Sequence, residues 1–64
     1  MKITEGDKVT YITHYTTQKG IVKGVCDDEN YLFVVFNCDN DWEHYSDYTG
    51  AKTLKSLLVK GWTI

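Results

Sequence analysis

Four side chains that could ligate zinc or form a nucleophile–base pair are spread along the chain: His14, Cys26, Cys38 and His44. Structural zinc sites are tetrahedral and usually contain two closely spaced cysteines, a pattern that this sequence lacks. If residues 27–30 form the turn of a hairpin, Cys26 lies opposite Tyr31, and Cys38 lies seven residues further along that strand. At about 3.3 Å per residue, roughly 23 Å then separates the two cysteines, too far for a shared metal or a disulfide. The spacing predicts free thiols and no metal site.

Calcium and catalysis are the next kinds of chemistry to consider. Oxygen-bearing side chains alternate in Asp39-Asn40-Asp41-Trp42-Glu43, but an EF-hand loop would need glycine and glutamate where this chain has His44 and Gly50. No cysteine–histidine pair has a local catalytic signature, and no glycine-rich phosphate loop is present. A chain of 64 residues also leaves little room for a deep pocket. We therefore predict a protein that is not an enzyme and has no cofactor.

The aromatic residues are the strongest functional signal, because five tyrosines, two tryptophans and two phenylalanines are many for so small a core. Phe33, Phe36 and one tryptophan are assigned to packing. If residues 42–48 form a strand, one face combines Trp42, His44 and Tyr48, and the other combines Glu43, Tyr45 and Asp47. Aromatic rings beside carboxylates can bind a lysine or arginine side chain. The alternative is that these rings fill the core and rim of a small barrel, and the three-residue spacing of Trp42, Tyr45 and Tyr48 also fits a twisted or bulged segment.

Charge is distributed unevenly along the chain, although the net charge is only −2. Residues 26–48 contain seven acidic residues and no lysine, whereas residues 49–64 contain three lysines and no acidic residue. All seven cations are lysines, so the bidentate guanidinium groups that read guanine or grip phosphate are absent. The middle of the chain should repel a polyanion, or else it is an acidic surface that maintains solubility.

The elements that must position these residues are mainly strands. Runs rich in β-branched and aromatic residues predict strands at 8–13, 21–26 and 31–36. Leu54, Leu57 and Leu58 follow Thr53 with helical spacing and predict one helical turn; Gly61 ends it, and 62–64 can form a last strand. The pattern predicts an all-β domain over residues 1–64, a five-stranded antiparallel barrel with a short helical turn before the last strand.

Two sets of residues carry a resemblance to known proteins. Gly6-Asp7-Lys8-Val9 followed by Lys19-Gly20-Ile21-Val22 resembles the opening of SH3-like barrels of the KOW and Tudor kind. The run Trp42-x-x-Tyr45-x-x-Tyr48-Thr49-Gly50, with Leu58 and Gly61-Trp62, resembles small uncharacterised proteins of phages and their bacterial hosts. The resemblance implies an SH3-like barrel with a binding role in nucleic-acid or protein recognition, and a phage-encoded modulator that docks on a host factor. KOW-type domains usually present basic loops, and the acidic centre of this chain departs from that.

The leading interpretation is a non-catalytic module that binds a protein with a basic segment through an acidic and aromatic surface. The residues expected to form it are Tyr11, Trp42, Glu43, Tyr45, Asp47 and Tyr48. The alternative is a KOW-like nucleic-acid binder that uses lysines gathered on one face. Those lysines are Lys8, Lys19, Lys23, Lys52 and Lys55. A third possibility is a structural piece of an assembly that contributes an edge strand. Residues 1–5 lack the apolar run of a signal peptide and no stretch is long enough for a membrane span, so we expect a cytoplasmic protein with no membrane contact.

Overall fold

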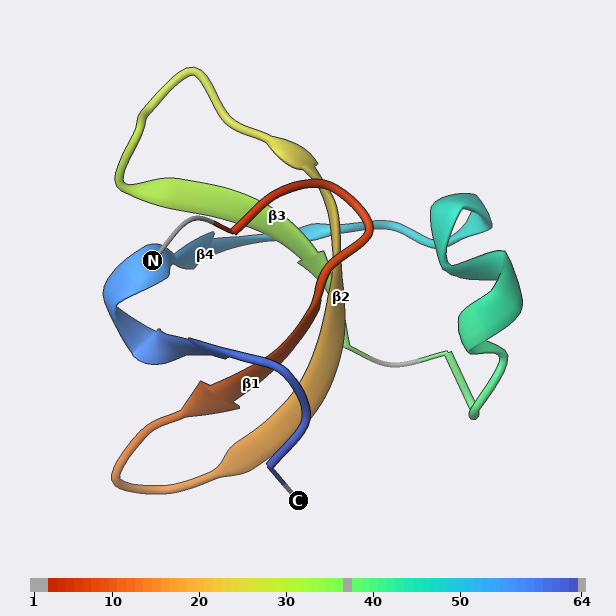
Figure 1. Cartoon of the computed structure of the whole chain (residues 1–64), viewed down its shortest axis with the longest axis horizontal. Coiled ribbons are helices and arrows are strands. Elements are labelled where there is room, and N and C mark those ends of the chain that lie inside the picture. Colours follow the sequence, from red (N-terminus) through yellow and green to blue (C-terminus); the bar gives the residue numbers. More distant parts are fainter. Residues whose placement is uncertain (1–2, 37, 64) are drawn as a thin grey trace.

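The computed structural model describes residues 3–36 and 38–63, whose strands form one antiparallel sheet (Figure 1). The strands are β1 (Lys8–Ile12), β2 (Thr17–Val25), β3 (Tyr31–Val35), β4 (Ala51–Leu54) and β5 (Leu58–Lys60). Two 3₁₀ helices accompany them, η1 (Trp42–Asp47) before β4 and η2 (Lys55–Leu57) before β5. The all-β class, the five antiparallel strands and the helical turn before the last strand are therefore confirmed.

The order of strands across the sheet is β4-β3-β2-β1-β5. β2 organises the sheet because its first half pairs with β1 and its second half pairs with β3. The register between β2 and β3 shifts between Val22 and Gly24, and such a bulge bends a strand and increases its twist. The sheet curls as a result, but among the described residues β4 and β5 are not joined by hydrogen bonds, so no ladder closes it into a barrel.

One face of the sheet, here called the inner face, carries the hydrophobic core. Val9, Val22, Leu32, Val34 and Leu58 are all buried there. They come from four strands, and alternation along each strand puts their neighbours on the opposite, outer face.

Gly20 is also on the inner face, paired with Val9, and it meets the core at very close range. A Cβ atom at Gly20 would lie 2.6 Å from Cγ1 of Val34 and 3.0 Å from the ring of Phe36. The absence of a side chain at this position lets Val34 and Phe36 pack directly on the backbone of β2.

β1 and β3 lie near their predicted ranges, β2 begins at Thr17, four residues before its predicted start, and the remaining elements differ. Residues 42–47 form η1 rather than a strand, and the fourth strand is β4, for which the sequence carries no strand signal. Only Lys55–Leu57 is helical in the region of the leucines, because Leu54 and Leu58 pair in the sheet. The prediction of a last strand at 62–64 was wrong for 62 and 63: β5 ends at Lys60, Gly61 turns the chain with a φ of 90°, and residue 64 lies outside the described residues.

No helix in the part of the chain that the structure describes is long and apolar enough to cross a membrane.

Candidate docking surface

The η1 helix repeats its burial every three residues. Trp42, Tyr45 and Tyr48 are half-buried, and the residues between them are exposed. A 3₁₀ helix has three residues per turn, so side chains at i and i+3 lie above one another. His44 has non-helical backbone angles (φ −112°, ψ 28°) and divides η1 into two short turns, and Tyr48 follows the second turn. The three half-buried rings lie on the less accessible side of this segment, which contacts β2, while Glu43 and Asp47 are exposed. The face on which Tyr45 groups with the two carboxylates, expected for a strand, does not form.

The turn that leads into η1 contains two residues with left-handed backbone conformations, Asp39 (φ 50°) and Asn40 (φ 66°). Aspartate and asparagine are the non-glycine residues that adopt this region most readily. The amide of Asp41 then donates a hydrogen bond to the carbonyl of Cys38, with an N–O distance of 2.8 Å, and the amide of His44 donates to the carbonyl of Asp41. The run of oxygen-bearing side chains considered as calcium ligands thus builds the turn before η1.

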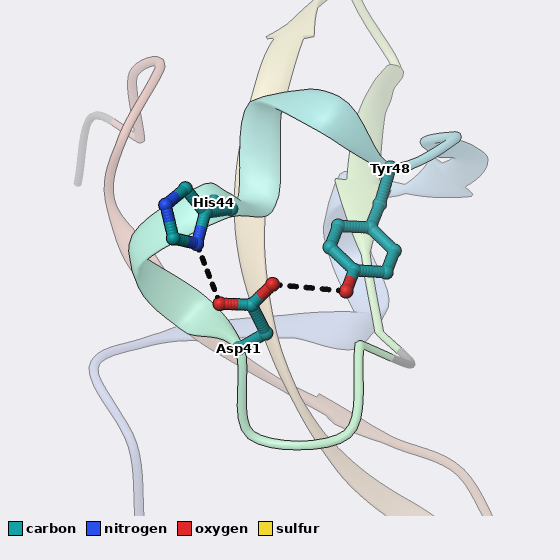
Figure 2. Close-up of polar contacts among 3 residues, drawn as sticks. All are labelled: Asp41, His44 and Tyr48. Carbon is teal, nitrogen blue, oxygen red and sulfur yellow. Dashed lines mark hydrogen bonds and ion pairs between the residues drawn. The ribbon is translucent and has the colours of Figure 1, made fainter.

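A hydrogen-bonded group of three side chains, Asp41, His44 and Tyr48, spans η1 (Figure 2). One carboxylate oxygen of Asp41 lies 2.6 Å from Nδ1 of His44, and the other accepts a hydrogen bond from the hydroxyl of Tyr48 at 3.0 Å. The bond to His44, followed by the one from Tyr48, lowers the pKa of Asp41. The same bond raises the pKa of His44, and donation to Asp41 raises the pKa of Tyr48.

Trp62 connects η1 to the sheet from the C-terminal end of the chain. Its ring lies 5.1 Å from the ring of Trp42, with an interplanar angle of 57°, and its Nε1 donates a hydrogen bond to the carbonyl of Gly20. The segment is held by buried Thr10, whose hydroxyl donates to the carbonyl of Gly61 and accepts from the amide of Thr63. The position of Trp42 is therefore fixed by contacts between segments far apart in the sequence.

A small buried layer lies on the outer face, near η1. Ile21 of β2 pairs with Val35 of β3, and both side chains point to the face opposite the core residues Val22 and Val34. They are nevertheless only 5% and 1% exposed. Cys38 is also buried, and this burial raises the pKa of its thiol. Neither Cys38 nor the half-buried Cys26 is in a disulfide. The sheet is thus covered on both sides at its centre, by the core on the inner face and by this outer layer under η1.

The structure brings together five of the six residues predicted for protein binding, all of them in or next to η1. Tyr11 is separated from them, because it lies on the inner face, where it packs on the core and its ring is 5.3 Å from that of Phe36. Figure 1 shows η1 on the opposite side of the curled sheet from η2, with the 26–30 loop at a different corner. The acidic residues of that loop and those of η1 thus form separate surfaces.

Four of the five lysines considered for nucleic-acid binding share the outer face: Lys8, Lys19, Lys23 and Lys52. They form two groups. Lys8 and Lys19 place their ammonium groups 4.7 and 5.2 Å from the ring centroid of Trp62. Lys23 donates a hydrogen bond to the carbonyl of Tyr48, and Lys52 lies over Tyr31. Lys55 lies in η2, outside the strands.

Phe33 of β3 is more accessible than its sequence context predicts. Phe33, which was assigned to packing, is 36% exposed, and Tyr31 is half-buried. Both lie on the outer face beyond the layer that η1 covers, because they alternate with buried Leu32 and Val34. The continuous apolar run 31–36 gave no signal for this difference, because the coverage of the outer face ends partway along the strand.

Comparison of the chain with protein-family models, with curated proteins and with solved structures gives no match.

Proposed function

We propose that the chain is a small non-catalytic binding module that docks on a protein with a basic segment through η1. The observation that carries the proposal is the division of η1 into an anchored aromatic side and an exposed acidic side. Trp42 packs against Trp62, the carbonyl of Tyr48 accepts a hydrogen bond from Lys23 of β2, and Glu43 and Asp47 stand in solvent. A recognition element that is ordered before binding loses less conformational entropy on association.

The chemistry of the partner follows from the exposed groups. The carboxylates of Glu43 and Asp47 attract lysine or arginine side chains, and the accessible parts of Trp42 and Tyr45 offer ring surface to the aliphatic portions or charges of the same side chains. A phage origin, which the likeness of the Trp42-x-x-Tyr45-x-x-Tyr48 run to small phage and bacterial proteins suggests, fits a protein that docks on a host factor. In this proposal, the module is an SH3-like, phage-encoded modulator that docks on a host factor.

The test is an amide NMR titration of the labelled protein with a lysine-rich peptide. We expect shifts at Glu43 and Asp47, and three- to ten-fold weaker binding, roughly, when both are neutralised as Glu43→Gln and Asp47→Asn. The matched control is Asp27→Asn with Glu29→Gln, which removes two exposed charges from the 26–30 loop. Equal weakening by both pairs would show attraction to net charge rather than docking on η1, and peptide shifts that avoid η1 would contradict the proposal.

A further inference from the structure

The part of the outer face that η1 leaves open has a composition of its own. Tyr31 and Phe33 of β3 lie beside Leu54 and Lys52 of β4, since the register pairs Tyr31 with Leu54 and Phe33 with Lys52. Phe33 and Leu54 are 36% and 39% exposed. The surface therefore presents large apolar groups to solvent, next to a strand at the edge of the sheet.

The surface beside Phe33 is flat because of a glycine. Gly24 is the partner of Phe33 on β2, and a Cβ atom placed on Gly24 would meet no other atom within 4 Å. The other flank of Phe33 is bounded by Gly50, where an added Cβ would lie 3.1 Å from Cβ of Phe33. A planar group could thus lie over the backbone of Gly24 and against the ring of Phe33.

Two lysines border this surface, and each makes one contact with a neighbouring residue. The ammonium group of Lys52 lies 4.7 Å from the ring centroid of Tyr31, which holds it beside Phe33. The ammonium group of Lys23 uses one N–H to bind the carbonyl of Tyr48 at 2.6 Å and retains its other two donors. Cations held beside an accessible ring are complementary to an anion that also carries a flat aromatic group.

We propose that Phe33, Lys23, Lys52 and Tyr31, around Gly24, form a second binding surface that takes one or two unpaired nucleotides of a single-stranded nucleic acid. We call these five residues the β3–β4 platform. A base stacks on Phe33, and the neighbouring phosphates bind Lys23 and Lys52. Lysines suit this role because the contact is to phosphate charge and not to a base edge.

The charges around the β3–β4 platform favour one path for the bound nucleic acid. Beyond Tyr31, an open hollow of about 450 Å³ is lined by Asp28 and Glu29 as well as by Leu54 and Lys55. Its two carboxylates repel phosphate, so the nucleic acid should leave the platform on the side of Lys23. Pairing of another β-strand with β4 is disfavoured, because β4 has only four residues and carries Lys52.

The experiment is an amide NMR titration with the single-stranded oligonucleotide dT6 at low and moderate salt. We expect shifts at Gly24, Phe33 and Lys52, binding that weakens as salt rises, and about ten-fold weaker binding in Phe33→Ala. The control is Tyr15→Ala, which removes an aromatic ring that is 97% exposed in the β1–β2 hairpin. A second pair of variants compares Lys52→Gln, which should weaken binding, with Lys60→Gln, which should not. Lys60 lies on the inner face, near Asp7.

Four results would overturn the proposal. The first is the absence of shifts with dT6 at low salt. The second is a set of shifts centred on Lys8, Lys19 and Trp62, which would place nucleic acid on the other lysine group. The third is equal binding by the Phe33→Ala and Tyr15→Ala variants. The fourth is a set of shifts at the same amides with a lysine-rich peptide but not with dT6, which would identify a protein surface. Dispersed amide spectra of each variant establish that it is folded.

Discussion

The carboxylate of Asp41 bonds to two side chains of the same segment, and through it pH acts on η1. The pKa of His44 is raised by its bond to Asp41. Its stabilising contribution is therefore present below the ordinary value of 6.5 and is lost as pH rises through the folded value. The pKa of Asp41 is lowered, so its contribution is present above 3.8 and is lost as pH falls through the folded value. The group of Asp41, His44 and Tyr48 therefore stabilises η1 most between pH 3.8 and pH 6.5.

We predict that the midpoint of thermal unfolding is higher at about pH 5.5 than at about pH 8, because the stabilisation by protonated His44 declines as pH rises above 6.5. His44→Gln should remove most of this difference, since the substituted side chain does not titrate. The comparison variant is His14→Gln in the β1–β2 hairpin, and this variant should keep the difference between the two midpoints. An unchanged pH dependence in His44→Gln would show that other groups determine it.

At the scale of the elements, the pair of tryptophans links η1 to the C-terminal segment. We expect Trp42→Ala and Trp62→Ala each to lower the free energy of unfolding. The double variant should lose less than the sum, because each single change already breaks the ring contact. A double-mutant cycle measured by urea unfolding should give a coupling of about 1 kcal/mol. Additive losses would mean that the rings act independently, with Trp62 supported by its bond to Gly20 alone.

Two glycines of β2 provide a test of how the strand packs. Gly20→Ala would force Cβ to within 2.6 Å of Val34, so we expect it to lower the free energy of unfolding by about 1–3 kcal/mol. Gly24→Ala meets no atom within 4 Å and should leave stability unchanged or raise it by about 0.4–1 kcal/mol. Urea unfolding of both variants measures the difference. Similar values for the two would contradict the close packing at Gly20.

The elements also show what the sequence could predict. Runs of β-branched residues were sufficient for β1, β2 and β3, because those strands form the centre of the sheet. β4 carries no such run: the spacing of Leu54, Leu57 and Leu58 favoured a helix, but pairing with β3 overrides it. The three-residue period of Trp42, Tyr45 and Tyr48 was visible as a pattern, although only the finished fold distinguishes a 3₁₀ helix from a bulged strand.

The candidate site was harder to predict than the strands, for a physical reason. Alternation along β1 predicts that Tyr11 and Thr10 point in opposite directions, but it does not say which face η1 will cover. Trp62 finds its place through a bond to Gly20, 42 residues away, and no local signal encodes that contact. The extent to which η1 covers the outer face also determines that Val35 is buried and Phe33 is accessible.

At the scale of the whole molecule, the sheet separates two apolar layers of different size. The inner core joins residues of β1, β2, β3 and β5, whereas the outer layer contains Ile21 and Val35, and Cys38 is buried at the start of the turn that leads into η1. The smaller layer buries less apolar area, so releasing η1 should cost less free energy than unfolding the sheet. We therefore expect η1 to open in a partial transition while the inner core remains folded.

Cys38 reports on this transition because its side chain is buried at the start of the turn that leads into η1. In a Cys26→Ser background, Cys38 is the only thiol. We predict that the rate at which a thiol reagent labels Cys38 in dilute urea depends weakly on the urea concentration, because opening of η1 exposes little surface. Trp62→Ala should accelerate this labelling more than it accelerates amide exchange in β2, because it loosens η1 and leaves the core in place. If labelling instead followed urea with the full slope of global unfolding, the two layers would form one cooperative unit, and η1 would be as firmly ordered as the sheet on which it rests.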